Sequence, residues 1–189
     1  MEHLDGVPPR RGLIIFLNGT SSSGKSSIAA ELLRELDEPY FHMAVDTFHA
    51  MRSPRPVAPD RLDALLHRTW QGFHRAVAGM AAVGNNVVVD HVLSAEWRLR
   101  DCLSLFVPQD VVLVGVRCPL EELERRERAR GDRPSGLAAR QLEQVHVHGV
   151  YDVECDTSRL DPVACARRIK DFLPDRPSPT AFEKLRAAF

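Results

Sequence analysis

Short apolar runs alternate along the chain with longer stretches in which apolar residues recur every three to four positions. The runs are rich in β-branched residues, as in Val87-Val88-Val89, and this pattern is typical of buried strands. The longer stretches, such as 61–82, place their apolar residues along one side of a helix. The predicted strands are 13–17, 40–46, 87–90, 111–117 and 151–155. The predicted helices are one ending near Leu36, then 61–82, 95–106, 119–130, 137–148, one opened by Asp161-Pro162, and 181–188.

The alternation of strands and helices predicts an α/β fold, with a five-stranded parallel sheet covered by helices on both faces. Ligands of such sheets bind beyond the carboxyl ends of the strands. Gly19, Asp46, Asp90 and Arg117 lie at or just beyond predicted strand ends, so we expect them to converge on one cleft. The 189 residues contain no internal repeat or interdomain linker and fit a single domain.

The segment Gly19–Ser26 matches G-x-x-x-x-G-K-[ST], the phosphate-binding P-loop, and it lies between the first strand and the first helix as that motif requires. Glycines let the backbone point several N–H groups into one hollow at a helix N-terminus, where an anion is favoured. The segment therefore predicts an ATP site, whereas a chance Gly/Ser-rich turn would lack the flanking strand and helix. The candidate binding residues are Gly19, Thr20, Ser21, Ser22, Ser23, Gly24, Lys25, Ser26 and Ser27.

Two oxygen ligands for Mg²⁺ are predicted near this loop. The Ser26 hydroxyl occupies the motif position that contacts the metal. Asp90 ends an apolar strand, which is the Walker B arrangement, and a carboxylate there holds Mg²⁺ directly or through water. The alternative for Asp90 is a helix cap or a turn acid.

Asp46 ends the second predicted strand, which we expect beside the P-loop strand. A carboxylate in this position could accept the proton of a substrate hydroxyl as that oxygen attacks the γ-phosphate. It could equally orient the substrate or cap a helix, and position alone does not separate these roles.

Arginines gather at the end of the 119–130 helix and in the Gly/Pro-containing segment after it. This composition suits a mobile lid that closes cations over a transferring phosphate. The other interpretation is a solvated helix face paired with nearby glutamates, which we expect for Arg125 and Arg128. Arg130 and Arg133 are the lid candidates and, with Lys25 and Asp46, the predicted catalytic residues. Arg126 fits either role, and Arg117 either contacts substrate or stabilises a strand end.

Composition narrows the function classes. The net charge of −1 and pI near 6.7 give no sign of a nucleic-acid-binding protein. Residues 1–11 are polar and no apolar run reaches membrane-spanning length, so we expect a cytoplasmic protein without a membrane partner. The four cysteines form no C-x-x-C pair and are expected as buried thiols. The eight histidines form no metal set, and His146 and His148 are expected on opposite sides of a helix.

Several segments resemble the chloramphenicol phosphotransferase family: NGTSSSGKSSI, AVDTFHAM, VVVDHVL, VGVRCPLEELERRERARGDR and VHVHGVYDVECDTS. The resemblance implies an adenylate-kinase-like fold and transfer of phosphate from ATP, with Mg²⁺, to an antibiotic hydroxyl, which confers resistance by inactivation. It implies that Asp46 is the catalytic base, that Gly19–Ser27 form the ATP loop, that Asp90 is the second acidic strand end, and that Arg130 and Arg133 belong to the lid. The implied segments are a core at 12–173, a lid at 126–137, an acceptor-site segment at 47–80 and a tail at 174–189.

The sequence departs from the family pattern around the acceptor. His91 stands where the family has a second acid after the strand-three aspartate, and residues 52–69 are rich in Pro, Arg and His. The acceptor therefore remains open between an antibiotic and a small metabolite or nucleotide, as in shikimate and gluconate kinases. A nucleotide-binding regulator is the alternative of a different class. Apolar positions on 61–82 and the terminal helix suit either a homo-oligomer or core packing.

Overall fold

The computed structural model describes residues 10–130 and 136–189 and contains one parallel sheet of five strands. The strand order is β2-β3-β1-β4-β5, which confirms the predicted α/β class. All strand pairs are parallel, and β1 lies between β3 and β4. The strands are β1 (Ile14–Asn18), β2 (Tyr40–Ala44), β3 (Asn86–His91), β4 (Val111–Arg117) and β5 (Val153–Asp156).

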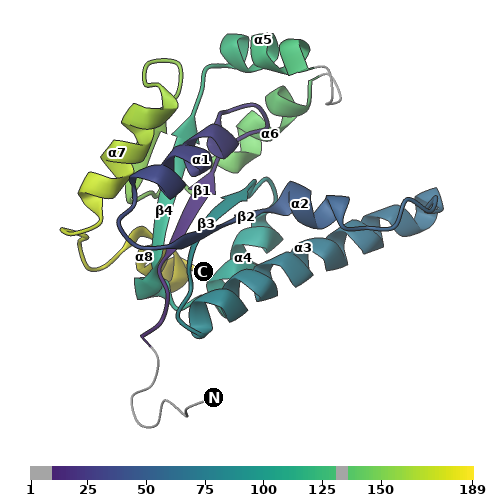
Figure 1. The fold of residues 1–189 in the computed structure, drawn as a ribbon. Coiled ribbons are helices and arrows are strands. Elements are labelled where there is room, and N and C mark those ends of the chain that lie inside the picture. Colours follow the sequence, from purple (N-terminus) through teal and green to yellow (C-terminus); the bar gives the residue numbers. More distant parts are fainter. Residues whose placement is uncertain (1–9, 131–135) are drawn as a thin grey trace.

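Helices cover both faces of this sheet (Figure 1). One face packs against α1 and α7, and the other packs against α3, α4 and α8. A long arm formed by α2 and α3 extends away from the sheet, and α5 and α6 lie over its upper end in the view shown. The helices are α1 (Lys25–Glu35), α2 (Val45–Ala50), α3 (Pro59–Ala82), α4 (Glu96–Leu105), α5 (Leu120–Arg130), α6 (Leu137–Val145), α7 (Pro162–Phe172) and α8 (Ala181–Ala188), with a 3₁₀ turn at Pro108–Asp110.

The buried strands explain the apolar runs in the sequence. Successive side chains of a strand point to opposite faces, so Ile14 and Phe16 join the α3–α4–α8 side while Ile15 and Leu17 join the α1–α7 side. All four are at most 1% exposed. A strand that is buried on both faces needs apolar residues at every position, which is why the pattern is continuous and not alternating.

The strand order corrects one prediction. β2 is an edge strand that pairs with β3, so Asp46 is not on the strand beside the P-loop strand. The reason lies in burial, since Val87, Val88 and Val89 of β3 are fully buried while Phe41 of β2 is half exposed. The more apolar strand takes the central place.

Several element boundaries also differ from the prediction. Asp46 lies in the first turn of the short helix α2, because β2 ends at Ala44. The helix α6 ends at Val145, so His146 and His148 follow it and do not lie on opposite helix sides. No described side chain caps the N-terminus of α3 or α4, whereas Asp161 caps α7 by accepting a hydrogen bond from the Ala164 N–H. Residues 131–135 of the predicted lid, including Arg133, lie outside the described residues.

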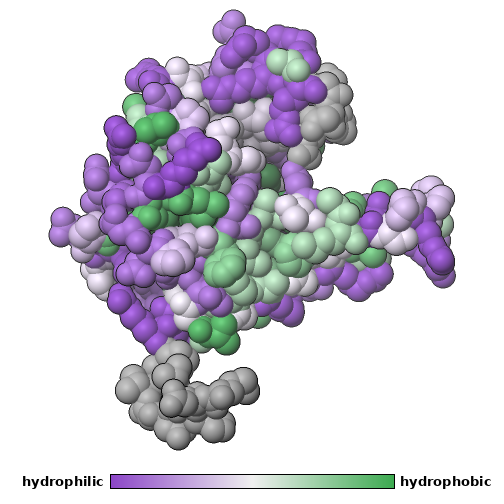
Figure 2. Space-filling model, viewed as in Figure 1, coloured by the Kyte–Doolittle hydropathy of each residue, from purple (hydrophilic) through white to green (hydrophobic). Residues whose placement is uncertain are grey.

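The face that carries the β2 edge is divided by polarity (Figure 2). Hydrophobic side chains gather over the α2–α3 arm, the hydrophilic α5 overhangs them, and the surface is hollowed between the two. Within the described ranges, no helix combines the length and apolar character that crossing a membrane requires. The four cysteines are free and buried, as expected.

Candidate active site

The P-loop is held in a conformation that its glycines allow. A Cβ on Gly19 would come within 2.6 Å of the Val116 carbonyl oxygen, so only glycine fits there. Gly24 has φ +95°, in the left-handed region that favours glycine, and it directly precedes α1. Ser22 holds φ 61° without being glycine, and such strained backbone is typical of ligand-binding loops.

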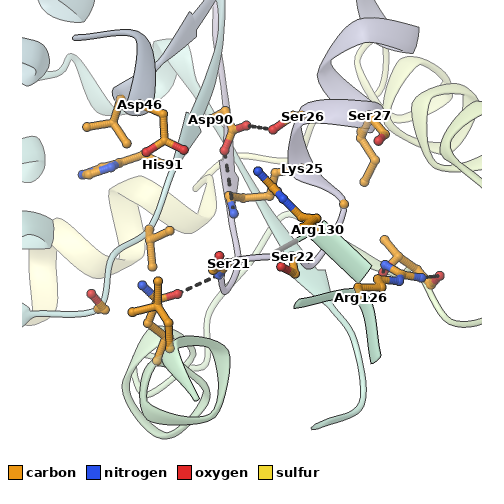
Figure 3. Close-up of a pocket in the computed structure, with 18 of the residues that line it drawn as sticks. Ser21, Ser22, Lys25, Ser26, Ser27, Asp46, Asp90, His91, Arg126 and Arg130 are labelled. Carbon is orange, nitrogen blue, oxygen red and sulfur yellow. Dashed lines mark hydrogen bonds and ion pairs between the residues drawn. The ribbon is translucent and has the colours of Figure 1, made fainter. Parts of the chain in front are cut away.

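Lys25, Ser26 and Asp90 lie together at the start of α1 (Figure 3). The Ser26 hydroxyl donates a hydrogen bond to Asp90 Oδ2 at 2.6 Å. The Lys25 Nζ lies 3.7 Å from Asp90 Oδ1 and donates to the Thr20 carbonyl at 2.8 Å. Lys25 is 7% exposed and Asp90 is 8% exposed, so both charges are largely removed from water. A buried pair of this kind interacts more strongly than a surface pair because the surroundings screen it less.

These residues fit a nucleotide with Mg²⁺. Mg²⁺ is usually held by one or two carboxylates together with substrate phosphates and water, and not by an all-protein cage. The described residues contain no group of three or more His, Cys, Asp or Glu side chains placed to hold a metal ion. In addition, the buried hydroxyls of Ser22 and Ser23 make no hydrogen bond with the described residues, and phosphate oxygens would be suitable acceptors for them.

Segments from later in the chain hold the loop. The Thr157 hydroxyl, just after β5, donates to the Ser23 carbonyl at 2.8 Å. Arg126 of α5 donates to the Thr157 hydroxyl and carbonyl at 3.1 and 2.8 Å, and to Glu122 at 2.7 Å. From α6, the Gln141 side-chain oxygen accepts a hydrogen bond from the Ser21 N–H at 2.6 Å. The position of α5 and α6 is therefore coupled directly to the loop.

Asn18 at the end of β1 is a buried junction that the sequence analysis did not single out. Its amide donates to the Val145 carbonyl and to the Tyr151 hydroxyl, each at 2.8 Å. Its side-chain oxygen accepts from the Leu93 N–H at 2.9 Å. Asn18, which directly precedes the first glycine of the loop, thus ties the segment after β3 to the end of α6. The sequence signal that could have identified Asn18 was its position between an apolar strand and the first glycine of the motif.

One cavity of about 1380 Å³ runs from the P-loop to the α2–α3 arm. On one side, called the donor side below, the cavity is lined by the P-loop, by Arg126 and Arg130 of α5, and by Arg140 and Gln141 of α6. On the opposite side, Asp46, Trp70 and other residues of the arm face it. The residues lining that second side are Val45, Asp46, His49, Arg52, Leu62, Leu66, Trp70, His91, Val92, Ser94 and Arg98.

Aromatic and basic side chains interleave on the second side. The Arg98 guanidinium lies 3.8 Å above the centre of the Trp70 ring, and Trp97 stacks on His67 with ring centres 4.0 Å apart. The His49 ring packs edge-on against Trp70 at 5.7 Å. Of these residues, His49, Trp70 and Arg98 line the cavity, so its arm side combines aromatic and basic groups.

His91 is the terminus of a buried chain of polar side chains. His74 Nδ1 lies 2.6 Å from Asp101 Oδ2, and His74 Nε2 lies 3.0 Å from His91 Nε2. Burial, more than any other factor, lowers the pKa of both rings. A neutral His74 that donates to Asp101 must accept from His91, so His91 Nε2 carries the hydrogen and its buried Nδ1 keeps a lone pair. In the sequence, His91 stood out only as a departure from the family pattern, and nothing indicated this chain.

The structure brings most of the predicted site residues together. The residues Ser21 to Ser27 (except Ser23), Asp46, Asp90 and Arg130 line the same cavity. Arg125 and Arg128 pair with Glu122 and Glu124, as predicted, but Arg125 also lines the cavity. Arg117 pairs with Glu154 and does not line the cavity. Arg126 contacts the loop region, and Arg98, Arg140, Gln141 and Thr157 were missed.

Several described proteins are similar to this chain in sequence or in fold. Two proteins from strains of Mycobacterium tuberculosis, each provisionally described as an O-phosphotransferase, are 32% identical over 97% of this chain and 91% of their own length. The M. tuberculosis APS kinase CysC, solved in complex with AMPPNP and APS, superposes with a TM-score of 0.65 at 18% identity, over 88% of this chain and 99% of that one. The Deinococcus radiodurans tunicamycin resistance protein superposes with a TM-score of 0.62 at 19% identity, over 86% and 96%.

The family model described as chloramphenicol phosphotransferase-like protein matches residues 12–174. This span includes every strand of the sheet, the P-loop and both sides of the cavity. The solved neighbours confirm a P-loop kinase fold. The chain therefore belongs to the chloramphenicol phosphotransferase-like family and is a phosphotransferase.

Proposed function

We propose that the protein transfers the γ-phosphoryl group of ATP to a hydroxyl of a small molecule. The observation that carries this proposal is a cavity that joins the P-loop to a second side containing Trp70 and a carboxylate, Asp46. Its volume of about 1380 Å³ exceeds the ~300–1,000 Å³ typical of a site for one drug-sized ligand, which suits a nucleotide and an acceptor together.

On the donor side, the P-loop amides and Lys25 bind the phosphates, and Ser26 and Asp90 hold Mg²⁺. When bound, Mg²⁺ offsets the negative charge of the phosphates. Lys25 lies at the loop between Thr20 and Asp90, and its buried ammonium is placed to stabilise charge on the phosphoryl group. Arg126, Arg130 and Arg140 line this side and add positive charge, and Arg133 is proposed to join them.

On the acceptor side, we assign Asp46 as the general base. Its carboxylate accepts the proton of the acceptor hydroxyl while that oxygen forms a bond to the γ-phosphorus, and the bond from phosphorus to the leaving oxygen of ADP breaks. Asp46 belongs to α2, which follows the edge strand β2, and Lys25 belongs to α1. The two groups therefore approach the cavity from different elements. Figure 3 shows Asp46 and His91 on one side of Lys25 and Arg126 on the other.

The family name makes an antibiotic hydroxyl the first acceptor to test, and inactivation of that antibiotic in the cytoplasm would confer resistance. The test incubates the protein with ATP, Mg²⁺ and a panel of hydroxyl-bearing antibiotics and metabolites, and searches by mass spectrometry for the mass of one added phosphate. An acceptor that gains phosphate supports the proposal, and nucleotide hydrolysis that a protein partner stimulates, without any phosphorylated small molecule, contradicts it.

Asp46→Asn removes the base but keeps the shape of the side chain. We expect kcat/KM for the acceptor to fall by about 10²–10⁴-fold, while ATP affinity is retained because Asp46 lies outside the P-loop. The matched control is Asp63→Asn, an exposed acid on α3 that does not line the cavity. Near-normal turnover of Asp46→Asn would remove Asp46 as the base.

A further inference from the structure

Arg98 is a half-buried cation in the wall of the acceptor side. It lies in the first turn of α4 and lines the cavity. Its Nη1 donates to the Val92 carbonyl and to the Ser94 hydroxyl, each at 3.0 Å, and its guanidinium plane covers the Trp70 ring. These contacts fix the guanidinium in position, so that it cannot swing out to solvent as a surface arginine does.

This cation has no counter-ion among residues 10–130 and 136–189. No described carboxylate lies within ion-pair distance of Arg98, and its Nε is buried without a hydrogen-bond partner. Burial lowers the pKa of Arg98 to about 10, which still leaves it charged at neutral pH. A fixed, partly desolvated charge without a partner costs free energy unless an anion reaches it.

The surroundings favour an anion that arrives with the acceptor. Of the acids that line the cavity, Asp90 is bonded to Ser26 beside the P-loop and Asp161 caps α7. Asp46 is thus the single described acid on the Arg98 side of the cavity. Arg52 also lines that side and adds a second positive charge, while Leu62, Leu66 and Trp70 supply apolar surface.

We propose that the acceptor carries a carboxylate, which binds the Arg98 guanidinium above Trp70 while the acceptor's hydroxyl faces Asp46. The planar fork of a guanidinium matches a carboxylate, and Val92 and Ser94 both engage Nη1 of Arg98, which leaves Nη2 as the donor for the acceptor. Repulsion between the carboxylate and Asp46 would help to keep the charged end of the acceptor away from the base. This inference rests on the proposed phosphotransferase function and names the class of its acceptor.

Ligand binding at this wall can be measured directly through the tryptophans. The chain has two tryptophans, and the Arg98 guanidinium lies 3.8 Å from the centre of Trp70 and 5.7 Å from that of Trp97. Intrinsic fluorescence therefore reports on this wall. We would titrate the protein with 4-hydroxycyclohexanecarboxylate and with the matching carboxamide, in the presence of Mg²⁺ and a saturating non-hydrolysable ATP analogue, so that the P-loop cannot bind the carboxylate.

The wild-type protein is expected to bind the acid at least about tenfold more tightly than the amide, since hydrogen bonds to charged groups are worth about 1.5–3 kcal/mol. Arg98→Gln is expected to reduce that preference to within about twofold, and Arg98→Lys, which keeps the charge, to retain part of it. The control is Arg100→Gln on the same helix, because Arg100 pairs with Glu96 outside the cavity and its loss leaves the preference unchanged.

Equal responses of the wild-type protein to acid and amide, including no response to either up to tens of millimolar, would overturn the proposal. So would a preference for the acid that survives in Arg98→Gln. Unchanged affinity of Arg98→Gln for the ATP analogue verifies that this variant is folded. Because the titration needs no phosphoryl transfer, its failure leaves the proposed reaction standing, and failure of the mass-spectrometric test leaves the carboxylate site standing.

Discussion

His146 is half-buried just after α6, with its Nδ1 2.6 Å from the Tyr151 hydroxyl. The Tyr151 oxygen accepts a hydrogen bond from Asn18, so its own hydrogen is available to His146 Nδ1. That arrangement requires an unprotonated Nδ1. Burial is the largest cause that lowers the pKa of His146 to about 4. Burial likewise lowers the pKa values of His74, His91 and His148.

These histidines predict a loss of stability in mild acid. A folded-state pKa below the unfolded value near 6.5 means that the unfolded chain binds more protons at lower pH. The stabilising contribution is therefore complete above pH 6.5 and is lost as the pH falls toward 4. Each such histidine contributes a slope of up to about 1.4 kcal/mol per pH unit, less where solvent screens it.

Urea unfolding between pH 7.5 and 5 would measure this slope. We expect His146→Asn to reduce it, whereas the matched change His42→Asn on the exposed edge strand leaves it unaltered. A free energy of unfolding that is flat across this range would contradict the assignment of neutral buried rings.

At the scale of elements, α6 is positioned by a carboxylate from α5. Glu127 is 5% exposed, and its two oxygens accept hydrogen bonds from the Gly136 and Ala138 N–H groups at 2.8 and 3.1 Å. It thus satisfies amides at the start of α6 and places a negative charge at the positive end of that helix. A small cluster of Cys118, Leu123 and Ala138 completes the contact between the two helices.

Glu127→Gln is expected to lower the free energy of unfolding by about 1–3 kcal/mol, since a buried acceptor and a charge are lost together. Affinity for ATP should weaken as well, because α6 carries Gln141, which bonds the P-loop. The control Glu124→Gln alters an exposed pair on the same helix and should cost less than about 1 kcal/mol. Unchanged stability of Glu127→Gln would show that α6 does not depend on this contact.

Local patterns in the sequence were sufficient for the strands, most helices and the P-loop, because apolar periodicity and the motif spacing are local properties. They predicted the P-loop, Asp90 and Arg130 at one cavity. They did not predict that β2 would be an edge strand, since strand order depends on packing between distant segments. The contacts of Asn18, Glu127 and Gln141 also span long separations in sequence or cross a break between helices.

At the scale of the whole molecule, one part of the core, the helix α8, lies apart from the cavity. The terminal helix α8 packs near the amino end of β4, where the Phe182 ring stacks on Phe106 at 6.0 Å. Phe182 is fully buried, and no residue of α8 lines the cavity. Core packing therefore accounts for the apolar side of this helix.

Phe182→Ala should lower the free energy of unfolding by about 3–5 kcal/mol through the cavity it leaves. The ATP affinity of the folded protein should stay within about twofold of the wild-type value. Phe189→Ala, at a half-exposed position on the same helix end, is the control and should cost less than about 1 kcal/mol. Chemical denaturation and nucleotide titration would test both, and a large drop in affinity without loss of stability would contradict this separation.

The edge position of β2 has a consequence for how this architecture can diversify. The residues that would recognise the acceptor come from one continuous stretch, from Val45 on α2 to Arg98 on α4. Apart from β3, which carries Asp90, that stretch lies outside the elements that hold the P-loop. Substitutions along the α2–α3 arm can therefore redirect the enzyme to a new alcohol while the phosphate-handling apparatus is inherited unchanged.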